Sequence, residues 1–218
     1  MELDQHYRHY WRRMELRAQA ERLRAPCLRW YHSEALNPTE RLLFERDRRA
    51  GRLLDFGAGD LRLKRKFLAA GFAGRYETLD VSDEFPHEYS DLGQVRGVFG
   101  AILCLEVIEH LPLTAFETLL GGLIDRLEPG GVLVISTPNP LCVVPMWARD
   151  SGHIQQYPLH DLVAALLARE LAVDAFRVRF VPARPSLSQR VRLLSQRALC
   201  YLLAVDYADG LLVIGTRT

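Results

Sequence analysis

The sequence predicts an α/β fold in which a parallel sheet carries helices on both faces. Four short apolar runs alternate with segments long enough to form helices. In chain order the runs are RLLDF, YETLDV, FGAILCL and GVLVISTP. Strands that are buried on both faces read as apolar runs of this kind. The chain has 218 residues, of which 49% are hydrophobic and 25% charged, so we expect one main domain with one sizeable core.

The first 50 residues predict a helical arm, or cap, ahead of that domain. Residues 1–24 repeat apolar side chains at helical spacing, and Asn37, Pro38 and Thr39 suit the start of a second helix. Residues 1–52 hold twelve arginines against eight acidic residues. This excess suits a phosphate or an anionic surface, but the whole chain prefers arginine to lysine, so composition alone explains it better.

Further helices and two more strands are expected in the second half of the chain. A helix is expected from near Leu113 to the Pro129-Gly130-Gly131 stretch, a second helix over residues 158–171, and a strand over 172–180. The final strand is expected over 209–218. Between the last two strands, residues 184–205 predict an inserted helix, which we interpret as a buried cap; a helix resting on a membrane surface is the alternative.

Several classes of protein are excluded by the composition. The apolar runs are shorter than the roughly 18 residues that a membrane-spanning helix needs. The first 13 residues are too polar for a signal peptide, so we expect a cytoplasmic protein. The four cysteines are far apart and suggest neither a zinc knuckle nor a disulfide framework.

A glycine turn follows the first apolar run. In the sequence DFGAGD, Asp55 precedes Gly57-Ala58-Gly59 and Asp60 follows them. Glycines at the carboxyl end of such a strand let a ligand lie against the backbone. An acid at the entrance of the next helix repels phosphate, so a ligand with a positive centre fits better than a dinucleotide.

Two further acids extend this candidate site. Asp80 ends the second apolar run, just before Val81, at a place where an acid typically accepts hydrogen bonds from ribose hydroxyls. A sugar together with a cation suggests S-adenosylmethionine. Asp91 then becomes a candidate for the adenine amino group, although an ordinary surface turn explains SDLG equally well.

An acidic stretch with a histidine follows the next strand. If LEVIEHL forms a helical turn, Glu106 shares a side with Glu109 and His110. Such a set, with His153 further along, offers two carboxylates and two imidazoles, which suit magnesium, manganese or zinc.

Five segments in order resemble the motifs of class I S-adenosylmethionine-dependent methyltransferases. They are LLDFGAGD, YETLDVS, FGAILCLEVIEHL, LEPGGVLVISTPNP and GHIQQYPLHDL. The resemblance implies a Rossmann-like, seven-stranded, mostly parallel sheet whose last strand is antiparallel. It also implies a methyltransferase domain over residues 51–218 behind the arm of residues 1–50. The departure is Asp60, which stands where a third glycine is frequent in the family.

The resemblance leaves the role of the acidic stretch open. In small-RNA 3′-terminal 2′-O-methyltransferases and ubiquinone-biosynthesis O-methyltransferases, a similar Glu-x-x-Glu-His stretch with a later histidine holds a divalent metal. Many class I methyltransferases with a similar stretch hold none, and their first glutamate lies near the cofactor. This metal-free interpretation is the favoured one, with His110 as general base beside Glu109, because imidazole accepts a proton at neutral pH.

The resulting hypothesis is an enzyme that methylates an oxygen of a small-molecule metabolite, with nitrogen and carbon acceptors left open. The alternative is a metal-dependent RNA 3′-terminal 2′-O-methyltransferase, against which the isoelectric point near 7.8 argues. A binding or scaffold protein without catalysis is the third hypothesis. The sequence does not determine the oligomeric state.

Overall fold

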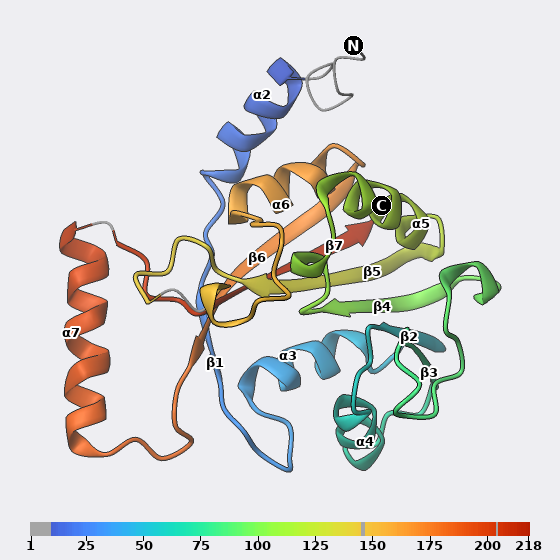
Figure 1. The fold of residues 1–218 in the computed structure, drawn as a ribbon, viewed down its shortest axis with the longest axis horizontal. Coiled ribbons are helices and arrows are strands. Elements are labelled where there is room, and N and C mark those ends of the chain that lie inside the picture. The colour runs from blue at the N-terminus through green and yellow to red at the C-terminus, as the bar shows by residue number, and fades with distance from the viewer. Residues whose placement is uncertain (1–9, 145–146, 204) are drawn as a thin grey trace.

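One twisted sheet of seven strands forms the centre of the protein in this computed structural model (Figure 1). The structure describes residues 10–144, 147–203 and 205–218. The strands are β1 (Cys27–Trp30), β2 (Arg52–Phe56), β3 (Arg75–Leu79), β4 (Phe99–Leu105), β5 (Leu127–Pro138), β6 (Leu171–Phe180) and β7 (Gly210–Arg217). Their order across the sheet is β1-β6-β7-β5-β4-β2-β3. Strand β7 runs antiparallel to β5 and β6 while the other pairs are parallel, which confirms the predicted α/β fold and its antiparallel last strand.

Helices cover both faces of the sheet. They are α2 (Tyr10–Ala20), α3 (Pro38–Asp47), α4 (Arg62–Ala69), α5 (Leu113–Ile124), α6 (Leu159–Leu167) and α7 (Leu187–Leu203). Helices α5 and α6 share one hydrophobic core with the sheet, and α3 and α4 share another (Figure 1). Helix α2 packs on α6, where Arg17 pairs with Asp161 at 3.0 Å.

The two cores follow from the alternation of side chains along the strands. In β2, Leu53 enters the core under α3 and α4, whereas its neighbour Leu54 enters the core under α5 and α6. In β4, Leu103 enters the core under α3 and α4, and Ile102 enters the core under α5 and α6. Successive side chains of a strand point to opposite faces, so a strand covered on both faces is apolar at most positions. This is why the sequence reads as continuous apolar runs.

The start of α3 is determined by local chemistry that the sequence predicted. Asn37 Oδ1 accepts the N–H groups of Thr39 and Glu40, and Glu40 Oε2 in return accepts the Asn37 N–H at 2.9 Å. Pro38 occupies the first turn, where no N–H donor is needed. The same Glu40 carboxylate forms a buried ion pair with Lys66 of α4 at 2.8 Å, which joins the two helices on this face.

The arm of residues 1–50 is not wholly helical. Its strand β1 pairs in parallel with β6 and forms one edge of the sheet. The stretch CLRW is short and its side chains are exposed or half-buried, so it has no apolar run to reveal it. Residues 1–9 of the predicted first helix lie outside the described residues.

The helix predicted from Leu113 to the Pro129-Gly130-Gly131 stretch ends earlier, at Ile124. The chain joins β5 at Leu127, which pairs with Phe99, while the next paired residues are Ala101 and Val132. Residues 128–131 therefore bulge out of the strand, with Gly130 at a φ of 76°. The glycines serve a bulge inside the strand and do not end the helix.

Helix α7 corresponds to the insertion predicted at residues 184–205, but it is not the buried cap that we expected. None of its residues is buried, and it runs beside the sheet, away from both faces (Figure 1). Among the described residues, no helix has both the length and the apolar character needed to span a membrane.

Candidate active site

A cavity of about 490 Å³ lies at the carboxyl ends of the parallel strands, beside the glycine turn. We call it the glycine-turn cavity. It is lined by Trp30, Thr39, Glu40, Leu43, Asp55, Gly57, Ala58, Gly59, Asp60, Arg62, Leu63, Leu105, Glu106, Ser136, Val178, Phe180, Gly210 and Leu211. The predicted residues Asp55 and Gly57-Ala58-Gly59 thus come together with Glu106. Ligands of open α/β sheets bind at this edge, where strands end and helices begin.

The glycine turn is shaped by backbone conformations that favour glycine. Gly57 has a φ of 78°, and a β-carbon built on it would lie 2.3 Å from Cγ2 of Val107. Its N–H donates to the Leu79 carbonyl at 2.8 Å, which ties the turn to the end of β3. Gly59 has a φ of 50° but faces open space. A side chain is therefore excluded at Gly57 by both contact and conformation, and at Gly59 by conformation alone.

Asp80 supports this turn from β3. Its Oδ2 accepts the Gly59 N–H at 2.8 Å and its Oδ1 accepts the Ser82 N–H at 2.9 Å. The carboxylate lies next to the cavity rather than among its lining residues. The neighbouring Val81 is 88% exposed.

Asp91 lies elsewhere. Its Oδ1 accepts the Gly93 N–H and caps the short 3₁₀ helix Leu92–Gln94. This contact matches the surface-turn interpretation of SDLG. Asp91 is not among the residues that line the glycine-turn cavity, so its predicted contact with adenine gains no support from its position.

Asp55 is buried at the floor of the cavity. Its Oδ2 accepts the Tyr76 hydroxyl at 2.7 Å. Burial raises the pKa of Asp55 to about 6, although the hydrogen bond from Tyr76 acts in the opposite direction. A positive ligand in the cavity would favour the ionised form of this carboxyl group.

Glu106 projects into the same cavity from the end of β4. Its φ of 55° places the backbone in the left-handed region, and its N–H donates to the Ser136 carbonyl. The Ser136 hydroxyl donates to Glu106 Oε1 at 2.6 Å. Surrounding protein raises the pKa of Glu106 to about 7, and the nearby Glu109 carboxylate adds to the rise. Glu106 is nevertheless an exposed residue, on the open side of the cavity.

Glu109, His110 and His153 form a second group, which we call the histidine cluster. One potential ligand atom from each lies within 4.8 Å of the others. The Glu109 side chain is fully buried, its Oε2 accepts the Thr137 hydroxyl at 3.0 Å, and its Oε1 has no hydrogen-bond partner. Burial raises the pKa of Glu109.

Both imidazoles of the histidine cluster are oriented by backbone carbonyls. His110 Nδ1 lies 3.0 Å from the Gly152 oxygen, and His153 Nδ1 lies 2.8 Å from the Trp147 oxygen. Because a carbonyl only accepts, each Nδ1 is placed to donate, and in the neutral ring Nε2 is then the nitrogen that carries the lone pair. His153 Nε2 is 4.0 Å from Glu109 Oε1.

This chemistry fits a divalent metal ion. Metal-binding imidazoles commonly donate their second N–H to a carbonyl or carboxylate, as both histidines do here. The unpartnered Glu109 oxygen supplies a third donor. One carboxylate and two imidazoles suit zinc or manganese better than magnesium.

Glu106 lies outside the histidine cluster, although Glu109, His110 and His153 are near enough for their charges to act on its pKa. The predicted helical turn begins only at Ile108, as a 3₁₀ helix that ends at His110. Consecutive residues of β5 anchor the two glutamates separately: the Ser136 hydroxyl donates to Glu106, and the Thr137 hydroxyl donates to Glu109. The predicted grouping of Glu106 with Glu109 and His110 stays a prediction.

The sequence analysis missed one wall of the glycine-turn cavity. Trp30 of β1 and Phe180 of β6 line it, with ring centroids 5.0 Å apart. Neither residue belongs to a motif. The sequence offered one indication: Phe180 is the last residue of the strand predicted at residues 172–180, and strand ends meet at this edge of the sheet.

Residues 10–175 match the family model described as a methyltransferase domain. Among curated proteins, no relative matches.

Solved structures share the fold. An S-adenosylmethionine-dependent methyltransferase of Archaeoglobus fulgidus superimposes with a TM-score of 0.63 at 14% identity, over 97% of this chain and 98% of that one. An S-adenosylmethionine-dependent methyltransferase of Mesorhizobium loti has a TM-score of 0.55 at 17% identity, over 83% of this chain and 96% of that one. The N-methyltransferase NodS of Bradyrhizobium japonicum WM9 has a TM-score of 0.53 at 16% identity, over 82% and 94%.

The fold and the glycine-turn cavity define an α/β protein with a cavity at the carboxyl edge of its sheet, where ligands of such folds bind. The family match covers most of the chain, and the chain therefore belongs to the methyltransferase domain family. It is a class I S-adenosylmethionine-dependent methyltransferase, as the order of its sequence motifs predicted.

Proposed function

We propose that this protein transfers the methyl group of S-adenosylmethionine to an oxygen of a small-molecule acceptor, with His110 as general base. The observation that carries the proposal is the geometry of His110. Its Nδ1 is engaged by the Gly152 carbonyl, which leaves Nε2 as a proton acceptor next to the buried Glu109. General base catalysis needs an oriented and unprotonated nitrogen of this kind.

The donor would bind in the glycine-turn cavity. The carboxylates of Asp55, Asp60 and Glu106 line it and favour a positive sulfonium. Glu40 also lines it but is paired with Lys66, and Arg62 is the cation of the lining. The main contribution of the protein would be alignment, because methyl transfer is an in-line displacement. The acceptor oxygen attacks the methyl carbon, the bond from carbon to sulfur breaks, and S-adenosylhomocysteine leaves while Nε2 of His110 takes the hydroxyl proton.

His110→Ala tests this assignment. Turnover should fall by about 10²–10⁴-fold, the usual contribution of a positioned base. The affinity for S-adenosylhomocysteine, measured by calorimetry, should stay within about twofold of the wild type, because the base does not hold the cofactor. His160→Ala is a matched control at the start of α6, outside both the cavity and the histidine cluster. Equal turnover in His110→Ala and wild type would contradict the role.

A second candidate function is metal-dependent 2′-O-methylation at the 3′ end of an RNA. The fit of the histidine cluster to a divalent ion favours it, with Glu109, His110 and His153 as ligands. A bound metal ion supplies Lewis acidity and orients the hydroxyl groups of an acceptor. Calorimetric titration with zinc or manganese tests the site without any activity assay, because Glu109→Gln and His153→Ala should each weaken binding at least tenfold.

Methyl-labelled cofactor separates the two candidates. The purified protein is incubated with a cell extract, with and without a chelator, and the label is separated into RNA, lipid, protein and small-molecule fractions. Label in small molecules or lipids that survives the chelator supports the metal-free metabolite enzyme. Label in RNA that disappears with the chelator supports the second candidate, and label confined to protein contradicts both.

A further inference from the structure

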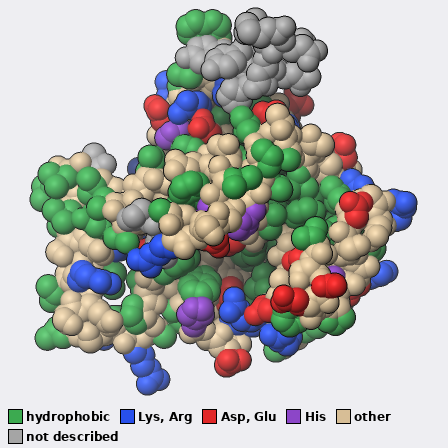
Figure 2. Space-filling model, in the orientation of Figure 1, with side chains coloured by type: hydrophobic (Ala, Val, Ile, Leu, Met, Phe, Trp, Pro, Cys, Tyr) green, Lys and Arg blue, Asp and Glu red, His purple; other side chains and the backbone are tan. Residues whose placement is uncertain are grey.

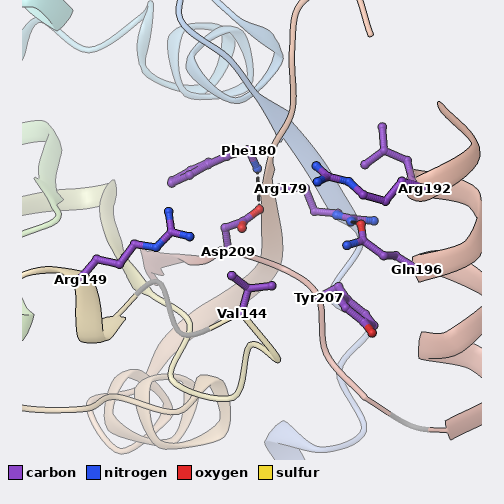
Figure 3. Close-up of a pocket in the computed structure, with 9 residues that line it drawn as sticks. Val144, Arg149, Arg179, Phe180, Arg192, Gln196, Tyr207 and Asp209 are labelled. Atoms are coloured by element: carbon purple, nitrogen blue, oxygen red, sulfur yellow. Dashed lines mark hydrogen bonds between the residues drawn. The ribbon is translucent and has the colours of Figure 1, made fainter. Parts of the chain in front are cut away.

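A second cavity, of about 260 Å³, lies between the inserted helix and the end of the sheet. We call it the arginine cavity. It is lined by Val144, Arg149, Arg179, Phe180, Arg192, Leu193, Gln196, Tyr207 and Asp209. Figure 3 shows Arg149 approaching from one side and Arg179 and Arg192 from the other, with Asp209 between them. No motif of the sequence predicted this cavity.

The charges of the arginine cavity are not balanced. Three guanidinium groups face one carboxylate, so the lining carries a net charge of +2. The Asp209 carboxylate also accepts the Phe180 N–H at 2.8 Å, and Arg179 donates to the Gln196 side chain. Among the described residues, the guanidinium groups of Arg149 and Arg192 have neither a hydrogen-bond acceptor nor an ion-pair partner.

A purely structural role explains only part of this arrangement. The contact of Arg179 with Gln196 joins β6 to α7 and accounts for one of the three arginines. Arg149 lies at the end of the 3₁₀ helix Trp147–Arg149, and Arg192 lies on α7. Arg149 and Arg192 are exposed, so solvent weakens their mutual repulsion, and the Asp209 carboxylate between them offsets one of the three positive charges. The remaining two positive charges have no counter-charge in the lining.

The arginine cavity is next to the glycine-turn cavity. Phe180, the last residue of β6, lines both of them. A ligand held in the arginine cavity would therefore extend past this ring toward the proposed cofactor site. This is the position in which a methyl acceptor must lie.

We propose that the arginine cavity binds a phosphoryl group of the methyl acceptor. The inference rests on the proposed function and names the substrate class for it. A phosphate monoester carries about −1.5 to −2 charges at neutral pH, which matches the net charge of the lining. Its several oxygens accept paired hydrogen bonds from the planar forks of more than one guanidinium, and arginine is the residue that makes them best. A carboxylate has half that charge.

The phosphoryl group has two possible sources, a soluble phosphate ester or a lipid headgroup. Helix α7 favours the second source, since it contains three arginines and no acidic residue. It also exposes Leu187, Val191 and Leu194, and Figure 2 shows hydrophobic side chains on this helix at the left of the view. A basic helix with an exposed apolar face suits an anionic lipid surface. With either source, it is a phosphoryl group that would contact Arg192.

Calorimetric titration with inorganic phosphate tests the site directly. Wild type should bind phosphate, and Arg149→Gln and Arg192→Gln should each weaken binding at least tenfold, because each removes a charge-assisted contact. Arg197→Gln is the matched control, on the same helix but outside the lining. Absence of phosphate binding, equal weakening by Arg197→Gln, or equal binding of acetate would overturn the proposal.

Two further measurements distinguish the two sources of the phosphoryl group and separate a failure of this proposal from a failure of the proposed function. If the acceptor is a lipid, wild type should sediment with phosphatidic acid vesicles but not with phosphatidylcholine vesicles, and Leu194→Gln should reduce sedimentation without changing phosphate affinity. Phosphate binding without sedimentation assigns a soluble ester. Titration of the same samples with S-adenosylhomocysteine shows which of the two proposals has failed when phosphate does not bind. If this ligand binds and phosphate does not, only the arginine cavity proposal fails; if it does not bind, the proposed function fails.

Discussion

The two cavities at the carboxyl edge of the sheet are built in opposite ways. The glycine-turn cavity is built from backbone turns at strand ends and is lined by Asp55, Asp60 and Glu106. The arginine cavity is built from long side chains that meet from a loop, a strand and an exposed helix, and it is basic. An acidic cavity suits a cationic donor, and a basic one suits an anionic acceptor. The difference in charge would separate the two proposed ligands at a single sheet edge.

The two cavities also differ in rigidity. Helix α3, which covers the glycine-turn cavity, is capped at its first turn and joined to α4 by the buried pair of Glu40 and Lys66. Helix α7, which covers the arginine cavity, has no buried residue. The donor side is thus fixed by packing, whereas the acceptor side relies on surface side chains. A family of enzymes can keep the first and vary the second.

The largest effect is expected at Gly57, on the donor side. Gly57→Ala places a methyl group 2.3 Å from Val107 Cγ2 and forces a side chain into a positive φ. The affinity for S-adenosylhomocysteine should fall at least about 100-fold, as the turn must move. Calorimetry measures this loss.

Two variants separate the contact from the conformation. Gly59→Ala has a positive φ but open space, so it should cost only about 1 kcal/mol of stability. In the double variant Gly57→Ala with Val107→Ala the contact is gone, so part of the affinity should return. If the double variant binds no better than Gly57→Ala, the backbone conformation alone explains the loss.

The donor side was the part that the sequence could predict. Apolar runs gave the strands β2 to β5 because strands covered on both faces need apolar residues throughout, and the glycines marked the turn. Local signals also gave the start of α3 at Asn37. These features depend on neighbours in the chain, which a sequence displays directly.

The acceptor side could not be predicted in the same way. Arg149, Arg179 and Arg192 come from three separate elements, and only the folded chain brings them together. Strand β1 has no apolar run because its side chains are exposed or half-buried. The anchoring of Glu106 and Glu109 likewise depends on Ser136 and Thr137, thirty and twenty-eight residues further along the chain.

The next largest effect concerns a buried carboxyl group in α3. Asp47 is buried and neither of its oxygens has a hydrogen-bond partner, and burial raises its pKa to about 7. Because this pKa lies above its value in the unfolded chain, the protonated group stabilises the fold at low pH. That contribution is lost as the pH rises through about 7.

Asp47→Asn removes the titration. At pH 8 the variant should be more stable than wild type by on the order of 2 kcal/mol, and the difference should shrink toward pH 4. Chemical unfolding at several pH values measures both. Glu45→Gln, an exposed neighbour in the same helix, should leave the pH dependence unchanged. A constant difference between Asp47→Asn and wild type across this range would show that Asp47 does not titrate in it.

A smaller effect is expected at Asp80. Its carboxylate accepts the Gly59 and Ser82 N–H groups, so Asp80→Ala should loosen the glycine turn and weaken S-adenosylhomocysteine binding about tenfold. Asp91→Ala is the informative comparison, since Asp91 caps a short helix outside the cavity lining. If only Asp80→Ala weakens binding, the predicted adenine contact of Asp91 is wrong. Equal weakening by both would support it.

The smallest effect on stability is expected at α7, and it tests the contrast in rigidity most directly. Leu194 is 66% exposed, and its helix has no buried residue. Leu194→Gln should change the free energy of unfolding by less than about 0.5 kcal/mol, as substitutions on open surfaces do. Phe67→Ala, in the core under α4, should cost about 3–5 kcal/mol in the same denaturant titration. A cost above about 2 kcal/mol for Leu194→Gln would mean that α7 packs on the domain in solution, and the acceptor side would then be as fixed as the donor side.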